Sequence, residues 1–212
     1  MNMILNYLFD PLCGWCYGAS PVLTELNDIP GIKLEFMPTG LFSDAGARPM
    51  NNEFAAFAWE NDQRISNITG QPFSEIYREK VLHDQQKKFD SGSATLAITA
   101  VSLSNPSREI EALKAIQRAR YVEGLDVTSL SVLAGVLSSQ GLENAAKKVL
   151  DPTANLLEAN HTRTERAKRL MREFGARGVP TFIAESGSKR WMLNSSILFS
   201  NPHEWVRQLV DS

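Results

Sequence analysis

The chain contains few of the features that mark specialised classes of protein. Among its 212 residues there are only 2 cysteines and 3 histidines. No apolar run approaches the roughly 20 residues of a membrane span. The 22 basic and 24 acidic side chains give a formal net charge of -2, whereas dedicated nucleic-acid-binding domains are strongly basic. The length allows one sizeable domain, or one domain that carries a large insertion.

The N-terminal residues 1–9 contain no Lys or Arg and no small-residue cleavage site, so we expect no secretory leader. Residues 3–9 are apolar and aromatic and are followed by Asp10-Pro11, which predicts a short buried strand. We therefore expect a cytoplasmic protein whose partners include neither membranes nor nucleic acids.

Both cysteines lie in one tetrapeptide, Cys13-Gly14-Trp15-Cys16. A bridge between them closes too small a loop to stabilise a fold, so the pair indicates chemistry. A helix that begins at Cys13 directs free backbone N–H groups at its sulfur and stabilises the thiolate that attacks a disulfide. Cys16 follows one turn later, within reach of a bridge. Cys13 can thus form a mixed disulfide with a substrate and Cys16 can resolve it, without a cofactor.

Two simpler interpretations of the cysteines stay open. A pair at this spacing can form half of a zinc site, but the other ligands would have to come from His83, His161 and His203, which lack ligand spacing. We therefore expect no metal. The thiols can also be inert core residues, and the tetrapeptide alone does not exclude this.

The rest of the chain alternates between strand and helix patterns. Residues 17–26 predict a helix and 32–36 a second strand, and from 51 to 174 nearly every pattern is helical. Ser91 is a candidate N-cap for a central helix formed by the apolar run 94–101. The further predicted elements are helices at 109–122, 128–139, 143–150 and 153–174, strands at 179–184 and 190–193, and a final helix at 202–210.

Two segments resemble one known family. One segment follows the first predicted strand and reads Asp10-Pro11-Leu12-Cys13-Gly14-Trp15-Cys16-Tyr17-Gly18. The other lies near the C-terminus and reads Gly178-Val179-Pro180-Thr181-Phe182. Together they are similar to the DsbA family of thioredoxin-fold thiol–disulfide oxidoreductases, and most of all to its FrnE-related predicted cytoplasmic disulfide isomerases. The resemblance implies an α/β fold, a thioredoxin fold interrupted by a large all-helical insertion. Residues 1–50 and 163–212 would form the thioredoxin-like domain and 51–162 the insertion.

The resemblance also implies roles for individual residues. Val179-Pro180 should be a cis peptide that faces the cysteines, so that Val179 and Pro180, with Trp15, contact the substrate. Pro21 matches the helix-kinking proline of thioredoxins, and Gly14, Asp10 and Pro21 support the active site. The implied partners are thiol- or disulfide-containing proteins or small molecules, and a redox partner that recycles the enzyme.

The chain departs from the family pattern at two positions. Trp15 stands where the well-known periplasmic member has a histidine that helps to stabilise the thiolate, so we expect a less oxidising couple. Tyr7 stands where thioredoxins have a buried carboxylate, which leaves open whether Asp10 or a water moves the proton of Cys16. A charge on Asp10 near Cys13 would oppose the effect of the helix.

Two groups of side chains are candidates for substrate contact. An apolar rim around the Cys13 sulfur could be formed by Trp15, Leu41, Phe42, Val179 and Phe182. Of these, Phe182 is better explained as a core residue. A basic run on the last long helix is best explained as its solvated face, with an acidic substrate such as glutathione as the alternative. It comprises Arg163, Arg166, Lys168, Arg169, Arg172 and Arg177.

Two other functions compete with a thiol–disulfide oxidoreductase or isomerase. Glutathione-dependent transferases and isomerases of the kappa and 2-hydroxychromene-2-carboxylate type share the DsbA-like fold but have a serine in place of Cys13. A non-catalytic adaptor that has kept the fold is the other alternative.

Overall fold

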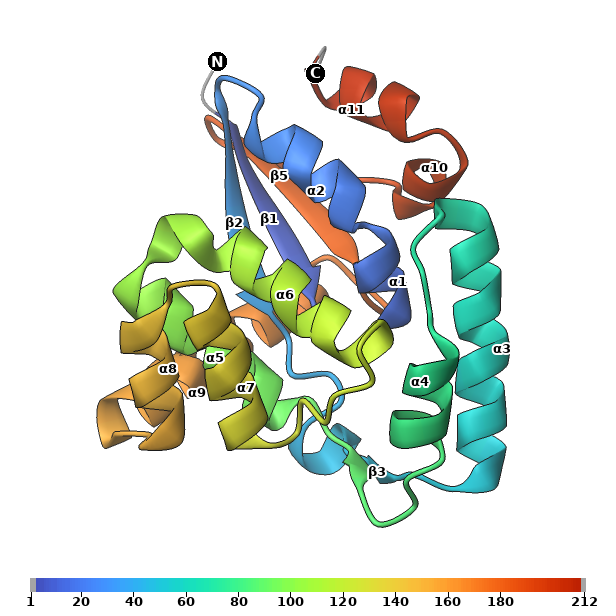
Figure 1. Ribbon diagram of the computed structural model, residues 1–212. Helices are drawn as coiled ribbons and strands as arrows, with labels where there is room; N and C mark the ends of the chain where they lie inside the picture. Colours follow the sequence, from blue (N-terminus) through green and yellow to red (C-terminus); the bar gives the residue numbers. More distant parts are fainter. Residues whose placement is uncertain (1–2, 211–212) are drawn as a thin grey trace.

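The computed structural model describes residues 3–210, and its central feature is a four-stranded mixed sheet (Figure 1). The strand order is β2-β1-β5-β6, with β1 parallel to β2 and the other pairs antiparallel. The strands are β1 (Met3–Phe9), β2 (Ile32–Pro38), β5 (Thr181–Ser186) and β6 (Lys189–Met192). Strands from both ends of the chain therefore meet in one sheet, as the resemblance predicts. Residues 1, 2, 211 and 212 of the predicted thioredoxin-like domain lie outside the described residues.

Two helices, not one, connect β1 to β2. The predicted helix at 17–26 is wrong in its bounds: α1 (Gly14–Gly18) starts directly after Cys13, and α2 (Ser20–Asn27) follows after a break at Ala19. Pro21 lies in the first turn of α2. Because proline has no N–H, it cannot donate to the carbonyl four residues earlier, and the first helix ends before it.

The segment between β2 and β5 is mostly helical, as predicted. Its helices α6 to α9 match the predicted spans to within two residues. It also contains a π-helical turn at 78–82, short 3-10 turns at 44–46 and 106–108, and a small unpredicted sheet of two-residue strands. The bounds are β3 (Arg48–Pro49), α3 (Asn52–Thr69), α4 (Glu75–Tyr77), β4 (Lys88–Phe89), α5 (Gly92–Ser104), α6 (Glu109–Tyr121), α7 (Leu130–Ser139), α8 (Glu143–Leu150) and α9 (Ala154–Glu173).

Helix α5 lies at the centre of the helical segment, since residues 94–101 are all buried. In Figure 1, α3 stands on one side of the molecule and α5, α7, α8 and α9 gather on the other, while α6 crosses between them. One apolar core includes side chains from the sheet, α2, α5 and α6. Helix α9 runs without interruption through position 163, so the domain division at that residue stays a prediction.

The basic run on α9 has the predicted character with one exception. Ala167 and Leu170 face a second apolar cluster with Leu8 and Ile183, and most of the basic side chains face outward. Arg163 is different: it forms an ion pair of 2.6 Å with the buried Glu109 and donates to the backbone oxygen of Phe36. Its guanidinium joins α9, α6 and β2, and is not part of a solvated face.

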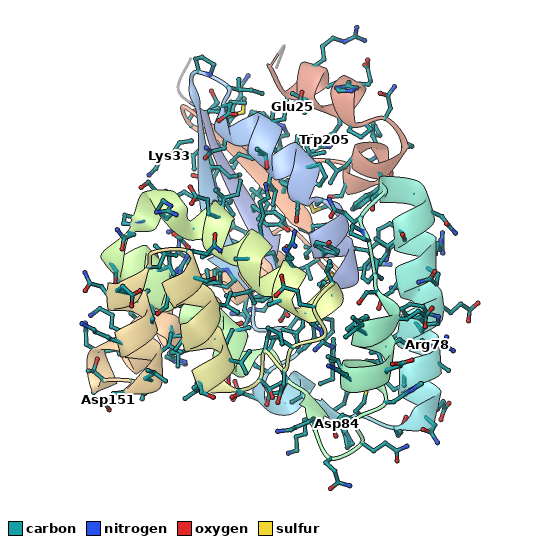
Figure 2. All side chains as sticks on the ribbon, in the orientation of Figure 1. Glu25, Lys33, Arg78, Asp84, Asp151 and Trp205 are labelled. Atoms are coloured by element: carbon teal, nitrogen blue, oxygen red, sulfur yellow. The ribbon has the colours of Figure 1, made fainter. Side chains whose placement is uncertain are left out.

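The C-terminal region completes the sheet and covers it. The strands β5 and β6 form the predicted hairpin, and the predicted final helix is α11 (Pro202–Val210), whereas α10 (Ser195–Ser200) was not predicted. The buried Trp205 of α11, labelled in Figure 2, packs edge-on against Phe182 of β5 with ring centroids 4.9 Å apart. Among the described residues no helix is long and apolar enough to cross a membrane.

Candidate active site

The sheet register brings the cysteine loop and the Val179-Pro180 segment to the same edge. Leu8, near the end of β1, pairs with Thr181, the first residue of the antiparallel strand β5. The loop that follows β1 and the loop that precedes β5 therefore lie side by side. The Cys13 thiol donates to the backbone oxygen of Val179 over 3.5 Å. The Val179-Pro180 peptide bond is cis.

Cys13 is the N-cap of α1, and its sulfur accepts a hydrogen bond from the backbone N–H of Cys16 at 3.4 Å. The helix start that the thiolate argument requires therefore lies at Cys13, although the apolar spacing predicts a helix only from residue 17. Both cysteines are free thiols. Cys13 keeps an exposed fraction of 8% whereas Cys16 has 0%. Both cysteines are buried, and Cys13 is the more exposed of the two.

The surroundings of Cys16 favour its protonated thiol over the thiolate. Burial raises the pKa of the Cys16 thiol well above its ordinary value, and the hydrogen bond and charge of Cys13 raise it further. The carboxylate of Asp10 acts in the same direction through its charge, while the main chain of Asp10 opposes it by hydrogen bonding. Cys16 is therefore a protonated thiol in the reduced protein, and it needs a base before it can attack.

Asp10 is buried and lies behind the redox loop. Its carboxylate accepts hydrogen bonds from the backbone N–H groups of Leu12 at 2.9 Å and Phe42 at 3.1 Å, and from the Ser91 hydroxyl at 2.7 Å. Burial raises the pKa of Asp10, and these hydrogen bonds partly offset the rise. The predicted cap is corrected here: the Ser91 side chain makes no capping bond to α5 and instead binds Asp10.

Two buried tyrosine hydroxyls hold the backbone of the loop. Tyr7 donates to the backbone oxygen of Cys16 at 3.3 Å, and Tyr121 of α6 donates to that of Leu12 at 2.8 Å. Burial raises the pKa of both tyrosines well above the ordinary value, so both hydroxyls stay neutral donors. Tyr7 thus replaces the carboxylate of thioredoxins with a group that fixes the loop but carries no charge.

A second buried polar group, next to Gly14 of the redox loop, was missed by sequence reasoning. Asp62 of α3 accepts a hydrogen bond from the Tyr77 hydroxyl at 3.0 Å. Burial raises the pKa of Asp62 to about 7, although Tyr77 and the charge of Arg120 both lower it. The buried Arg120 guanidinium lies 5.3 Å from the ring centroids of Tyr77 and Phe89. Because α3 shows no sign in the sequence of facing the cysteines, only the three-dimensional fold reveals this group.

The predicted rim is only partly assembled. The ring of Trp15 packs edge-on against Phe199 of α10 at 4.8 Å and lies 5.9 Å from the guanidinium of Arg64. Phe182 is core, as predicted, with an exposed fraction of 0%. Phe42 packs on Phe89, and only Leu41 is markedly exposed.

Other predicted residues have different surroundings. Pro21 is exposed and lines a cavity of about 660 Å³ together with residues of α6 and α7. Pro180 lines a separate cleft of about 580 Å³ with residues 175–178 and 192–196. Within residues 3–210 no group of three or more His, Cys, Asp or Glu side chains could hold a metal ion.

The model of one protein family matches residues 4–200, described as the DSBA-like thioredoxin domain. The chain belongs to this family. No curated protein matches the sequence. Membership of the DSBA-like family makes the chain a thiol–disulfide oxidoreductase in the broad sense, with a thioredoxin fold and a helical insertion.

Solved structures of similar proteins agree with this assignment. The cytosolic disulfide reductase DsbM from Pseudomonas aeruginosa is 32% identical with a TM-score of 0.87, over 98% of this chain and 97% of that one. A candidate protein disulfide isomerase from Nitrosomonas europaea is 27% identical with a TM-score of 0.81, over 100% and 97% of the two chains. A 2-hydroxychromene-2-carboxylate isomerase, 20% identical over 98% of each chain with a TM-score of 0.59, shares the fold.

Proposed function

We propose that the protein is a cytoplasmic thiol–disulfide oxidoreductase that works through a mixed disulfide on Cys13. The observation that supports this best is the position of the Cys13 sulfur, which is within hydrogen-bonding distance of the Cys16 N–H and the Val179 oxygen. The cytoplasmic location rests on the similarity to DsbM, which is described as cytosolic.

The first step is attack of the Cys13 thiolate on a substrate disulfide, R–S–S–R′. A bond forms between Cys13 and one substrate sulfur, the substrate S–S bond breaks, and R′–S⁻ leaves with the electron pair. The N–H of Cys16 stabilises the attacking thiolate. We propose that the oxygen of Val179, the cleft beside Pro180 and the Trp15 ring position the substrate, with Gly14, Asp10 and Pro21 supporting the site.

The second step releases the reduced substrate. Cys16 transfers its proton to the buried carboxylate of Asp10, and the thiolate attacks the Cys13 sulfur. A Cys13–Cys16 disulfide forms and R–S⁻ leaves with the electron pair. The substrate disulfide has then gained two electrons and the enzyme has lost them. A thiol such as glutathione can restore the dithiol, since the DsbM relative has also been solved with bound glutathione.

The contacts of Cys13 favour reduction or isomerisation over strong oxidation. One neighbour, the Cys16 N–H, stabilises the thiolate, while the Val179 oxygen accepts a hydrogen bond that only the thiol can donate. The apolar Trp15 adds no further donor. A strong oxidant needs a reduced form that is stabilised much more.

The experiment is to trap the intermediate. Cys16→Ser should accumulate a disulfide between Cys13 and its substrates, seen by mass spectrometry under non-reducing conditions, and Cys13→Ser should accumulate none. If Cys13 is unreactive, and glutathione binds and both variants keep a glutathione-dependent activity, the transferase alternative is correct. If neither variant changes activity or binding, the protein is an adaptor.

A further inference from the structure

Two exposed arginines lie beside the parts of the chain that surround Cys13. The guanidinium of Arg64, on α3, lies 5.9 Å from the centre of the Trp15 ring in the redox loop. Arg177 follows the end of α9 and lines the cleft of about 580 Å³ beside Pro180. The residue before Pro180 contributes the backbone oxygen that contacts the Cys13 thiol. Two distant segments of the chain therefore each bring an arginine to the neighbourhood of the reactive sulfur.

Neither of these arginines is paired with an acidic side chain. Within residues 3–210 the side chains of Arg64 and Arg177 form no ion pair and no hydrogen bond. The exposed Glu60 precedes Arg64 by one helical turn but lies beyond ion-pair distance. Three other arginines, by contrast, each have a glutamate at 3.1 Å or less, namely Arg163, Arg166 and Arg190. An exposed guanidinium without such a partner can bind an anion from solution.

The cleft and the helix beside Trp15 contain no acidic side chain. Among the described residues that line the cleft, Arg177 is the only charged one, and the others are apolar, small, hydroxyl or amide residues. Helix α10, whose Phe199 packs on Trp15, has no charged residue. The carboxyl groups of Asp10 and Asp62 are close to the redox loop, but both are buried, and burial raises the pKa of each. The exposed charges in these surroundings are therefore positive, although the whole chain has a net charge of -2.

We propose that Arg64 and Arg177 determine specificity by favouring disulfides that carry a carboxylate close to the reacting sulfur. A guanidinium binds a carboxylate through two parallel hydrogen bonds. Even without direct contact, it raises the local concentration of anions within the Debye length of about 8 Å. The Cys13 thiolate repels an anionic substrate, and the two arginines offset this repulsion. The proposal rests on the proposed function, because it names the class of disulfide that Cys13 attacks.

The test compares an anionic disulfide with a neutral one. The probe 5,5′-dithiobis(2-nitrobenzoate) has a carboxylate on each ring, whereas 2,2′-dithiodipyridine has no charge near neutral pH. Each releases an absorbing product when Cys13 attacks, so stopped-flow absorbance gives both rate constants. The readout is the ratio of the anionic to the neutral rate constant, because a change in the fraction of Cys13 thiolate alters both equally. We expect Arg64→Gln and Arg177→Gln each to lower this ratio roughly two- to threefold, and the double variant roughly fivefold.

Three controls separate the effect of charge from that of structure. Lys147→Gln removes an equal charge from an exposed position on α8, which lies away from α1 in Figure 1, and should keep the wild-type ratio. Arg64→Lys and Arg177→Lys keep the charge and should retain most of the preference for the anionic probe. High salt should lower the wild-type ratio towards that of the double variant, because salt screens exposed charges.

A second set of substrates distinguishes the sources of the carboxylate. It consists of glutathione disulfide, a disulfide-linked peptide with glutamate on both sides of its cysteine, and the same peptide with glutamine. If the wild type prefers the glutamate peptide and the double variant does not, acidic segments of proteins are the source. If the double variant is slower only with glutathione disulfide, the source is a small anionic disulfide.

The two proposals fail in different ways. A double variant that keeps the wild-type ratio of the anionic to the neutral rate constant would overturn the role of the two arginines. A wild-type Cys13 that reacts with neither the anionic nor the neutral probe would instead overturn the proposed function itself.

Discussion

The Asp62 carboxyl group occupies the space that a side chain at position 14 would fill. A β-carbon on Gly14 would lie 2.7 Å from Asp62 Oδ1 and 2.9 Å from Ile65 Cδ1, both on α3. The redox tetrapeptide thus approaches α3 at Gly14 and contacts Val179 through the Cys13 sulfur. Any larger residue at position 14 would force these two α3 side chains to shift, whereas the backbone conformation itself does not call for glycine.

Gly14→Ala should therefore destabilise the protein. Since the added methyl group meets a buried carboxyl and a buried isoleucine, we expect the free energy of unfolding in urea to fall by about 1–3 kcal/mol. The control is Gly135→Ala on α7, where an added β-carbon meets nothing within 4 Å. That variant should be neutral or more stable by up to about 1 kcal/mol. Equal effects of the two substitutions would show that α3 does not restrict position 14.

Asp62 should make stability depend on pH in an unusual direction. Burial raises its pKa from 3.8 to about 7 in the folded state. Between these two pKa values the folded protein holds a proton that the unfolded chain has lost. The stabilisation that Asp62 gains from this proton is therefore complete below the lower pKa and disappears as the pH rises to the higher one. Asp62→Asn cannot titrate, so it should not lose stability with rising pH in this way. The loss in the wild type amounts to about 4 kcal/mol of unfolding free energy at most.

The measurement is the difference in free energy of unfolding between wild type and Asp62→Asn at several pH values. The variant should gain stability relative to wild type as pH rises from about 4 to about 7, and the difference should be constant above that. Glu60→Gln, an exposed change on the same helix, is the control. Parallel curves for Asp62→Asn and wild type would contradict the raised pKa.

Trp15→His should make the redox couple more oxidising. A histidine next to Cys16 places a cationic donor near the thiolate of Cys13 and stabilises the reduced form. We expect the potential, measured by equilibration with glutathione, to rise by about 30 mV or more, which corresponds to about 1.4 kcal/mol. Trp15→Phe keeps an aromatic ring against Phe199 and serves as the control. The idea fails if the histidine variant is no more oxidising than the phenylalanine variant.

Arg163 and Arg166 should differ sharply although they are neighbours on α9. Arg163→Ala leaves the buried Glu109 without its ionic partner, so we expect a loss of about 3–5 kcal/mol in the free energy of unfolding. Arg166 pairs with Glu35 while its side chain is 51% exposed. Arg166→Ala should therefore cost about 0–1 kcal/mol. Similar losses of stability in both variants would show that Arg163 behaves as part of the solvated helix face that the sequence predicts.

The fold and the reactive cysteines could be predicted because their signals are local or belong to a family pattern. The strand before Asp10, the tetrapeptide and the Val179-Pro180 segment are continuous stretches of sequence. Side chains that complete the site from distant helices leave no such signal. Asp62, Tyr77 and Arg120 became part of the site only through tertiary packing.

Ser91 shows how a local rule can be overridden by tertiary contacts. A serine before an apolar helical run predicts an N-cap, and the helix does begin there. The Ser91 backbone has right-handed helical angles instead of the extended ones of a side-chain cap, and its hydroxyl donates to the buried carboxylate of Asp10, which is distant in sequence. The position was found from the sequence and the role was not. The break between α1 and α2 was missed because the apolar spacing continues through it.

The hydrogen bond from Tyr121 to Leu12 has a consequence for how this molecule can be divided. It ties the reactive loop to a helix that a minimal thioredoxin lacks. Trimming the chain to its sheet and flanking helices would leave the Leu12 carbonyl without its donor. The inserted helices are therefore part of the scaffold of the catalytic loop, and variants meant to change substrate range should graft onto them instead of removing them.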